Sequence, residues 1–253
     1  KMYLFEYQAK ALMREQGIPV LEGIVATSEQ RALDAARELG EGPWVIKAQI
    51  HAGGRAEGRI CDSDELRGIE FTDTVLEVGR TAARMLGGNL ITPQTTRQGE
   101  TINAVYIEPE IRSELQVFLA ILIDGDRGEP ICLASVQGGS QVERDIVDDP
   151  NSLVRVSLGA ADQIALDVGQ DVAAQLGLRS SVRTAFAQLV QQLHALFIAR
   201  DLSLIEINPL AIRANDSLVV LDARVTVDDN ALYRQPAMAA LASRTDRSEA
   251  EER

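Results

Sequence analysis

The sequence is poor in cysteine, in histidine and in positive charge, and each shortage excludes a class of protein. Of its 253 residues only two are cysteine and two are histidine. Cys61 and Cys132 have no neighbouring Cys or His at metal-ligand spacing, so we expect buried or neutral thiols and not a zinc site or a disulfide framework. With 25 Lys and Arg against 38 Asp and Glu, the formal charge is −13, which disfavours nucleic acids and anionic membranes as partners. Any phosphate must therefore be bound locally, by a few cations, backbone N–H groups or a divalent metal.

Long apolar segments are also absent. The longest unbroken apolar run, Val117 to Ile123, is far shorter than the roughly 20 residues that span a bilayer. No apolar segment of the signal-peptide type opens the chain. We expect a soluble protein in a reducing, cytoplasmic compartment, with one large domain or two small ones.

Hydrophobic periodicity predicts a mixture of helices and strands, which indicates an α+β or α/β fold. Predicted helices cover 5–16, Thr27 to near Gly40, 74–86, 162–176 and 180–200. Predicted strands cover 23–26, 44–50, 102–108, 115–124, 131–136 and 153–158. Thr27 followed by Gln30 is a capping-box pattern at the start of the second helix. Turn residues 124–128 indicate a hairpin, and a last hairpin joins 202–212 to 218–227.

A glycine-rich loop follows the predicted strand that contains Lys47. The segment continues through His51, Gly53 and Gly54 to Arg55. Adjacent glycines let backbone N–H groups approach an anion, while Lys47 and Arg55 supply positive charge and His51 could orient the loop. The alternative is a structural turn with Lys47 extending its ammonium group from the strand end to solvent.

The last hairpin brings polar side chains together within an apolar segment. Glu206 and Asn208 are two apart on one strand and share a face, and the hairpin count places Asp222 opposite Asn208 to within one residue. Three oxygen donors of this kind suit Mg²⁺. The alternative is a polar hairpin face open to solvent. His194, on a predicted helix, is expected to pack or to point outward without a role. No arrangement of a nucleophilic catalytic triad is apparent, and we assign no catalytic residue.

These segments resemble a known family, the β subunits of succinate–CoA ligase and malate–CoA ligase. The matching segments are 5–10, 42–55, 134–139, 206–210, 221–224 and 229–234, in the family's order along nearly the whole chain. The resemblance implies an ATP-grasp fold, with two lobes that clasp a nucleotide over residues 1–235. Residues 236–253 are then a charged tail or a linker toward a CoA-ligase domain.

The resemblance also implies roles for individual residues. Lys47, Gly54, Arg55 and Glu108 would bind the nucleotide, ATP or GTP. Asn208 and Asp222 would hold Mg²⁺. The family forms acyl-CoA through a phosphohistidine on a separate α subunit, which would be the partner of this chain.

Three positions depart from the family pattern. Glu57 stands where a lysine is usual in the glycine loop, and Gln116 and Gln137 stand where glutamates are found. An acid in place of a cation near a triphosphate weakens binding. A catalytically weakened ATP-grasp module with a binding or regulatory role is therefore the alternative function, and a different ATP-grasp carboxylate ligase is a third hypothesis.

Overall fold

Two compact units make up the chain, each with its own sheet and its own core. One unit combines residues 1–20 with 113–253, and the other is Leu21–Arg112. The computed structural model describes residues 2–61, 63, 65–139, 153–159 and 161–241. We refer to the first as the large unit and to the second as the small unit.

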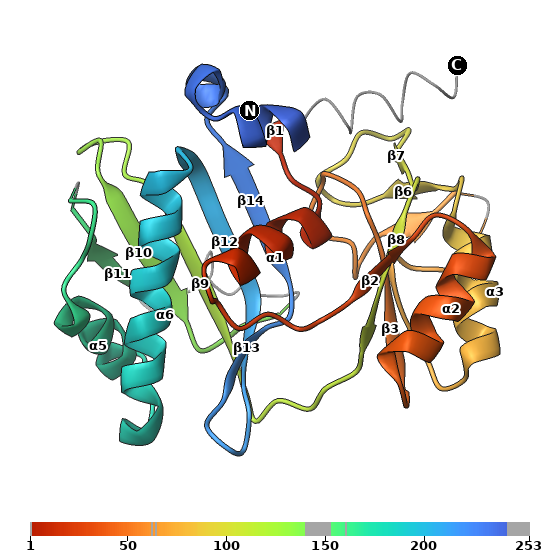
Figure 1. The fold of residues 1–253 in the computed structure, drawn as a ribbon, viewed down its shortest axis with the longest axis horizontal. Coiled ribbons are helices and arrows are strands. Elements are labelled where there is room, and N and C mark those ends of the chain that lie inside the picture. The colour runs from red at the N-terminus through yellow and green to blue at the C-terminus, as the bar shows by residue number, and fades with distance from the viewer. Residues whose placement is uncertain (1, 62, 64, 140–152, 160, 242–253) are drawn as a thin grey trace. The chain divides into compact units, whose positions relative to one another are not determined.

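The small unit contains an antiparallel sheet and two helices (Figure 1). Its strand order is β2(Ile24–Ala26), β8(Val105–Pro109), β3(Trp44–Ala48) and β5(Ile69–Thr72). The helices are α2(Glu29–Leu39) and α3(Val75–Met85), and a second small sheet consists of β4(Arg59–Ile60), β6(Asn89–Ile91) and β7(Glu100–Thr101). Apolar residues from both helices and from β3 and β8 form one buried cluster, which makes β3 and β8 a rigid platform for the residues they carry.

Helix α2 begins one residue later than the capping pattern predicts. The hydroxyl of Ser28, and not of Thr27, accepts a hydrogen bond from the Arg31 amide at 3.2 Å. The side chain of Gln30 donates to Asp34 along the helix and does not close a capping box. The capping-box prediction was therefore wrong, because a serine follows the threonine and takes the N-cap position instead.

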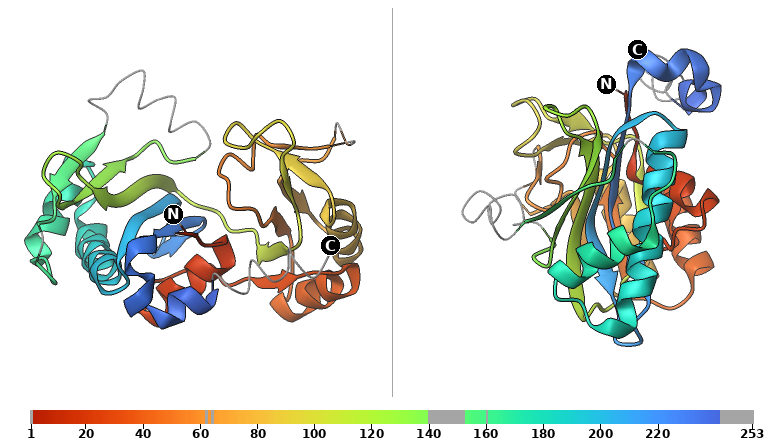
Figure 2. Two further views of the ribbon diagram at one scale, coloured as in Figure 1. Left: turned by 90° about the horizontal axis from the view of Figure 1, so that it is seen from above. Right: turned by 90° about the vertical axis from the view of Figure 1, so that its left-hand side faces the viewer.

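The large unit is a mostly antiparallel sheet covered on one face by helices. The strand order is β1(Met2–Tyr3), β14(Ala223–Val227), β12(Leu202–Ile212), β9(Leu115–Ile123), β10(Pro130–Ser135) and β11(Val154–Ser157), with β13(Leu218–Val220) also paired to β12. The helices α1(Glu6–Glu15), α5(Leu166–Gln175) and α6(Ser180–Ala199) lie on the same side of the sheet (Figure 2). A 3₁₀ helix, η2(Asp229–Arg234), follows β14.

Both predicted hairpins are confirmed. Strands β9 and β10 pair antiparallel, with Ile123 opposite Pro130, and β12 pairs antiparallel with β13 and β14. The apolar stripe of α6 is buried against the sheet, with Phe186 and Leu193 fully enclosed. The helices bury one face of the sheet, so the polar side chains of β12 and β14 are left on the other.

The expected tail begins within the large unit's core. Residues 236–241 are helical, and Met238 is buried in the large unit's core with an exposed fraction of 3%. Residues 242–253 of the expected tail lie outside the described residues. Within the described part of the chain, no helix combines the length and the apolar character needed to cross a bilayer.

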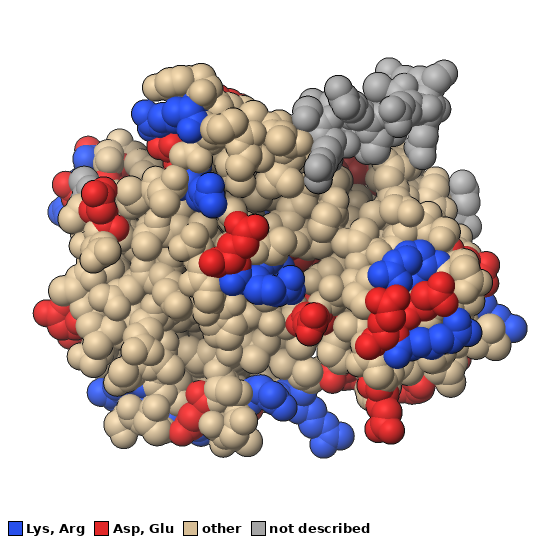
Figure 3. All heavy atoms as spheres, in the orientation of Figure 1, with Lys and Arg blue, Asp and Glu red and all other residues tan. Residues whose placement is uncertain are grey.

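Both cysteines are free. Burial raises the pKa of the Cys132 thiol to about 12, so this side chain stays protonated and acts as a small apolar residue. Cys61 is partly exposed. The surface in Figure 3 shows acidic and basic side chains interleaved over α2, where Arg31 pairs with Glu38 and Arg37 with Asp34. The described residues on this face present no continuous basic patch.

Candidate functional site

Lys47 and Glu108 form a buried ion pair in the small unit. In the register of β3 and β8, Lys47 lies opposite Tyr106 and Glu108 lies opposite Val45, so the two side chains are diagonal neighbours on one face. Lys47 Nζ is 2.7 Å from Glu108 Oε2, and the side chains are 8% and 0% exposed. The structure therefore contradicts the alternative in which Lys47 extends its ammonium group into solvent.

The glycine loop folds back onto the strand that precedes it. Arg55 is buried and donates from Nη1 to the carbonyl oxygen of Ala48, the last residue of β3, at 2.9 Å. Gly54 is exposed and has a φ of +75°, which favours glycine. Arg55 thus anchors the loop. Its guanidinium group is held at Ala48, the residue that follows Lys47.

Side chains already accept hydrogen bonds from two backbone amides of this loop. The His51 amide donates to Glu100 Oε2 at 2.8 Å, and the Gly53 amide donates to Gln94 Oε1 at 3.1 Å. A phosphate at these amides would have to displace Glu100 and Gln94. His51 is held by its backbone amide, and the expected role of its side chain in orienting the loop stays a prediction.

Glu57 lies in a tight turn directly after Arg55. Its amide donates to the carbonyl oxygen of Gly54 at 3.2 Å, and the Gly58 amide donates to that of Arg55 at 3.1 Å. A Cβ atom on Gly58 would lie 2.9 Å from the Thr92 side chain, so this end of the turn packs closely against its neighbours. The turn therefore fixes the backbone at Glu57, beside the loop that the family resemblance links to phosphate.

In the large unit, Asp222 lies directly opposite Asn208. Leu210 pairs with Val220 and Ile207 with Ala223, which puts Asn208 and Asp222 in register between them. The Asn208 amide donates to the carbonyl oxygen of Asp222 at 3.2 Å. The hairpin count from the sequence is thus confirmed for the backbone.

Glu206 shares the polar face of this hairpin with Asn208. Ile205 and Ile207 are buried, whereas Glu206 and Asn208 are partly exposed. This alternation places both polar side chains on the face of β12 away from the core. Both side chains are partly accessible, so solvent reaches this polar face.

The side chain of Asn208 is held in place by a glycine that is distant in sequence. Its Oδ1 accepts from the Gly139 amide at 2.6 Å, and its Nδ2 donates to the Gly139 carbonyl oxygen at 3.1 Å. Gly138 donates to the carbonyl oxygen of Gln116 on β9 at 3.0 Å. The segment that contains Gln137 therefore passes beside both β9 and β12, where Gln116 and Asn208 lie.

The two other departures from the family pattern lie near this contact. Gln116 is exposed and donates from Nε2 to Ser113 Oγ at 3.2 Å. Gln137 is exposed, and its amide donates to Ser135 Oγ at 3.2 Å. A Cβ atom on Gly139 would lie 3.5 Å from Gln116 Oε1, so Gln116 approaches the glycine that holds Asn208.

The donor set on the hairpin fits Mg²⁺. Asn208 and Asp222 offer an amide and a carboxylate oxygen, Glu206 offers a second carboxylate, and an amide oxygen has a second lone pair besides the one that Gly139 uses. Over the described ranges, no three His, Cys, Asp or Glu side chains gather as a metal cluster. A small number of protein oxygen ligands is enough for Mg²⁺, because water and phosphate oxygens complete its coordination shell.

Arg224 is a neighbour of this pair that the sequence patterns did not single out as a site residue. It lies opposite Glu206 in the register of β12 and β14, and its guanidinium carbon is 5.5 Å from the ring centre of Tyr3. The hairpin count that pairs Asn208 with Asp222 also pairs Glu206 with Arg224 and could have identified it. The polar face therefore carries a cation beside its carboxylates.

His194 is on α6 and is fully buried. Burial lowers its pKa, against smaller upward effects of Gly159 and Asp162. His194 therefore packs in the core and does not point outward, and it stays neutral at pH 7.

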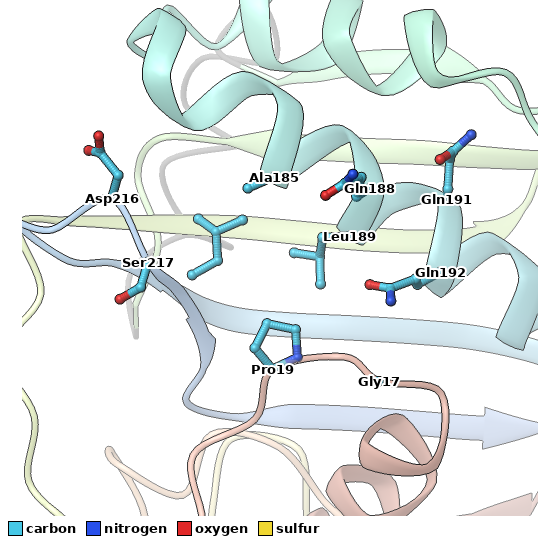
Figure 4. Close-up of a pocket in the computed structure, with 10 residues that line it drawn as sticks. Gly17, Pro19, Ala185, Gln188, Leu189, Gln191, Gln192, Asp216 and Ser217 are labelled. Carbon is cyan, nitrogen blue, oxygen red and sulfur yellow. The ribbon is translucent and has the colours of Figure 1, made fainter.

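A separate pocket of about 600 Å³ lies on the large unit between α6 and the segment around Pro19 (Figure 4). Its lining is Gly17, Pro19, Ala185, Gln188, Leu189, Gln191, Gln192, Asp216, Ser217 and Leu218. Gln191 donates to the Ile164 carbonyl oxygen at 2.8 Å and so ties α6 to the segment before α5. None of the predicted site residues lines this pocket.

Comparison with known proteins identifies the family. A model of the ATP-grasp domain matches residues 3–212. Curated relatives named succinate–CoA ligase [ADP-forming] subunit beta are 39% identical over 242 residues in Nitrobacter hamburgensis and 39% over 248 residues in Paracoccus denitrificans. The matches cover 95% and 97% of this chain but only 61% and 62% of those proteins, so the chain spans about three fifths of their length.

Solved structures show the same fold at lower sequence identity. A dinucleotide-forming acetyl-coenzyme A synthetase from Ca. Korarchaeum cryptofilum has a TM-score of 0.60 and 17% identity, covering 90% of this chain and 94% of that one. The ATP citrate lyase of Methanothrix soehngenii has a TM-score of 0.65 and 18% identity, covering 94% of this chain and 54% of that one. Since the family model matches most of its length, this chain belongs to the ATP-grasp domain family.

Proposed function

We propose that this chain is the nucleotide- and Mg²⁺-binding portion of an ADP-forming acyl-CoA ligase β subunit of the succinate–CoA ligase type. The observation that carries the proposal is the register of β12 with its partner strands, which sets Asp222 against an Asn208 side chain held by Gly139. The curated relatives, which match 95% or more of the chain in the two cases above, carry the name of that subunit and support it.

In the small unit, Lys47, Gly54, Arg55 and Glu108 bind the nucleotide. Lys47 holds its ammonium group at a fixed place through Glu108, so the cation needs little reorganisation to meet a phosphate oxygen. Gly54 and Arg55 form the loop over the phosphates. The ADP-forming name of the relatives favours ATP over GTP.

In the large unit, Asn208 and Asp222 hold Mg²⁺. Bound there, the ion supplies positive charge to the phosphate oxygens of the nucleotide. Asn208 keeps its amide oriented through Gly139, and Asp222 contributes the negative charge. Glu206 and Arg224 flank this pair on the same face.

The phosphoryl acceptor belongs to a partner α subunit. In this chain His194 is buried, and His51 is part of the glycine loop. Neither suits the role of a phosphohistidine that visits a second site. Residues 1–235 form the two ATP-grasp lobes, and the helical residues 236–241 complete the large unit through Met238, in the cytoplasm.

Calorimetric titration with ATP, with and without Mg²⁺, tests the proposal. Wild-type protein is expected to bind ATP more tightly with Mg²⁺, and Asp222→Ala is expected to remove that difference while the fold is kept. Asp171→Ala is the matched control, since it removes an exposed carboxylate from α5. Equal Mg²⁺-ATP affinity in wild type and Asp222→Ala contradicts the metal assignment.

Radiolabelled ATP tests the phosphoryl-transfer part. The chain alone is expected to take up no acid-labile, base-stable label, because it lacks the acceptor. Label on His51 or His194 would contradict the proposed α-subunit partner. A supplied α subunit is not expected to restore acyl-CoA formation in full, because the chain spans only about three fifths of its relatives' length. The weakened binding module, for which Glu57 is the main argument, is the alternative function.

A further inference from the structure

A second buried ion pair, in the large unit, touches the backbone beside Asp222. Lys10 on α1 is fully buried, and its Nζ is 2.9 Å from Glu6 Oε1, one helical turn earlier. The same ammonium nitrogen donates to the carbonyl oxygen of Leu221 at 2.6 Å. A lysine at the N-terminal end of the chain thus binds the residue immediately before the proposed metal ligand.

This contact sets the orientation of the peptide group that leads into Asp222. The Leu221 carbonyl oxygen and the Asp222 amide nitrogen belong to one planar group, so a bond to the oxygen restricts the rotation of both. On either side, the Leu221 amide donates to the Pro209 carbonyl oxygen at 3.1 Å and the Asn208 amide donates to that of Asp222 at 3.2 Å. The Leu221 carbonyl oxygen lies between these two hydrogen bonds along the chain, and Lys10 is its donor.

Leu221 and Asp222 lie where the strand pairing of the hairpin is interrupted. Strand β13 ends at Val220 and β14 begins at Ala223. A regular ladder would hold the backbone there without help, whereas an interruption leaves peptide orientation to individual contacts. A charged donor is a stronger anchor for a carbonyl group than a neutral one.

Packing alone does not explain the pair. Burying an ammonium and a carboxylate together costs desolvation, and apolar side chains of similar volume often stabilise a core as well or better. The long Lys10 side chain reaches the Leu221 carbonyl oxygen. Glu6 compensates the charge, which lets the ammonium stay buried.

We propose that Lys10 is a positioning residue for the metal ligand Asp222, and that Glu6 keeps the Lys10 ammonium in place. The inference rests on the proposed function of Asp222. Lys10 acts through a peptide group and is not itself assigned as a ligand. It acts by holding the Leu221–Asp222 peptide group so that the Asp222 carboxylate is presented toward the Asn208 side of the hairpin.

The experiment compares the ratio of ATP dissociation constants without and with Mg²⁺ in three proteins. Lys10→Met keeps the apolar length of the side chain and removes the donor, and is expected to lower the ratio at least tenfold. Leu12→Ala, a buried change on the same helix, is the matched control and is expected to leave the ratio within twofold of wild type. ATP affinity without Mg²⁺ is expected to be the same in all three.

A second variant covers the case in which Lys10→Met does not fold. Glu6→Gln combined with Lys10→Met removes both charges, leaves no isolated buried ion, and is expected to lower the ratio equally. Hydrogen exchange at the Asn208 amide, whose acceptor is the Asp222 carbonyl oxygen, is expected to accelerate in either Lys10 variant and not in Leu12→Ala. This readout needs no metal.

The outcomes separate the inference from the proposed function. Wild-type protein without any Mg²⁺ effect refutes the metal assignment, and the positioning role with it. A normal Mg²⁺ effect in wild type that persists unchanged in the Lys10 variants overturns the positioning role alone, as does unchanged exchange at Asn208. An equal fall of the ratio in Leu12→Ala also overturns the positioning role, because a general weakening of α1 would then explain the result.

Discussion

Lys47 Nζ lies 2.7 Å from Glu108 Oε2, and the pair is almost completely enclosed within the small unit. The two residues come from adjacent antiparallel strands, and the family resemblance assigns both to the nucleotide. Their contact couples the two assignments, since a change at either residue alters the charge that the other experiences.

The first prediction concerns this pair. Lys47→Ala leaves the Glu108 carboxylate buried without its counterion, so we expect a loss of roughly 3–5 kcal/mol in the free energy of unfolding. Lys47→Met combined with Glu108→Gln is expected to lose much less, because no isolated charge remains. Urea unfolding of both variants and wild type measures the difference.

The double variant also tests the nucleotide role without the stability defect. Loss of a charge-assisted contact to phosphate costs about 1.5–3 kcal/mol, so ATP is expected to bind at least about tenfold more weakly. An ATP affinity equal to that of wild type would show that the pair is structural only.

The second prediction concerns the acid in the glycine loop. Glu57→Lys restores the cation that the family pattern has at this position and is expected to tighten ATP binding roughly threefold at low salt, with the gain reduced at high salt. Glu41→Lys makes the same charge change at an exposed position of the small unit and is the control. Titrations at two salt concentrations decide the matter. If Glu41→Lys tightens ATP binding as much as Glu57→Lys does, the effect comes from net charge and not from the position of Glu57.

The third prediction concerns the glycine that packs against β9. A Cβ atom on Gly138 would lie 2.9 Å from the carbonyl carbon and oxygen of Gln116, and backbone atoms of a sheet cannot move aside. Gly138→Ala is therefore expected to shift Gly139 away from Asn208 and to reduce the Mg²⁺ effect on ATP binding. Gly125→Ala, with no atom within 4 Å of its Cβ, should change nothing. Calorimetry with both variants checks this, and full Mg²⁺ dependence in Gly138→Ala would contradict it.

The fourth prediction concerns pH. Burial lowers the pKa of His194 in the folded state below its ordinary value of 6.5, while the nearby Asp162 carboxylate opposes the shift more weakly. Below pH 6.5 the unfolded chain binds the proton more readily, so this histidine makes stability fall as pH decreases, by at most about 1.4 kcal/mol per pH unit. His194→Leu is expected to show a shallower decline between pH 7 and 5. Denaturant unfolding at several pH values measures the slopes, and parallel curves for wild type and His194→Leu would refute the prediction.

Local sequence patterns determined most of the helices and strands, and they also predicted the pairing of Asn208 with Asp222 in the candidate site. Helical periodicity and turn residues are set by neighbours a few positions apart, so α6 and both hairpins could be predicted. The opposition of Asn208 and Asp222 followed from counting along one hairpin, which needs no knowledge of the remaining chain. The capping of α2 failed by one residue because Ser28 and Thr27 carry similar hydroxyl groups and compete for the same position.

Only the tertiary structure decided which distant groups hold these residues. Gly139 lies 69 residues from the Asn208 side chain that it binds, and Lys10 lies 211 residues from Leu221. Such contacts depend on which strands become neighbours, here β12 beside β9 and β14, and on how α1 packs beneath them. The burial of Lys47 with Glu108 likewise arises from the pairing of β3 with β8. Periodicity along one segment contains no information on that pairing, because the free energy that selects it comes from the whole core.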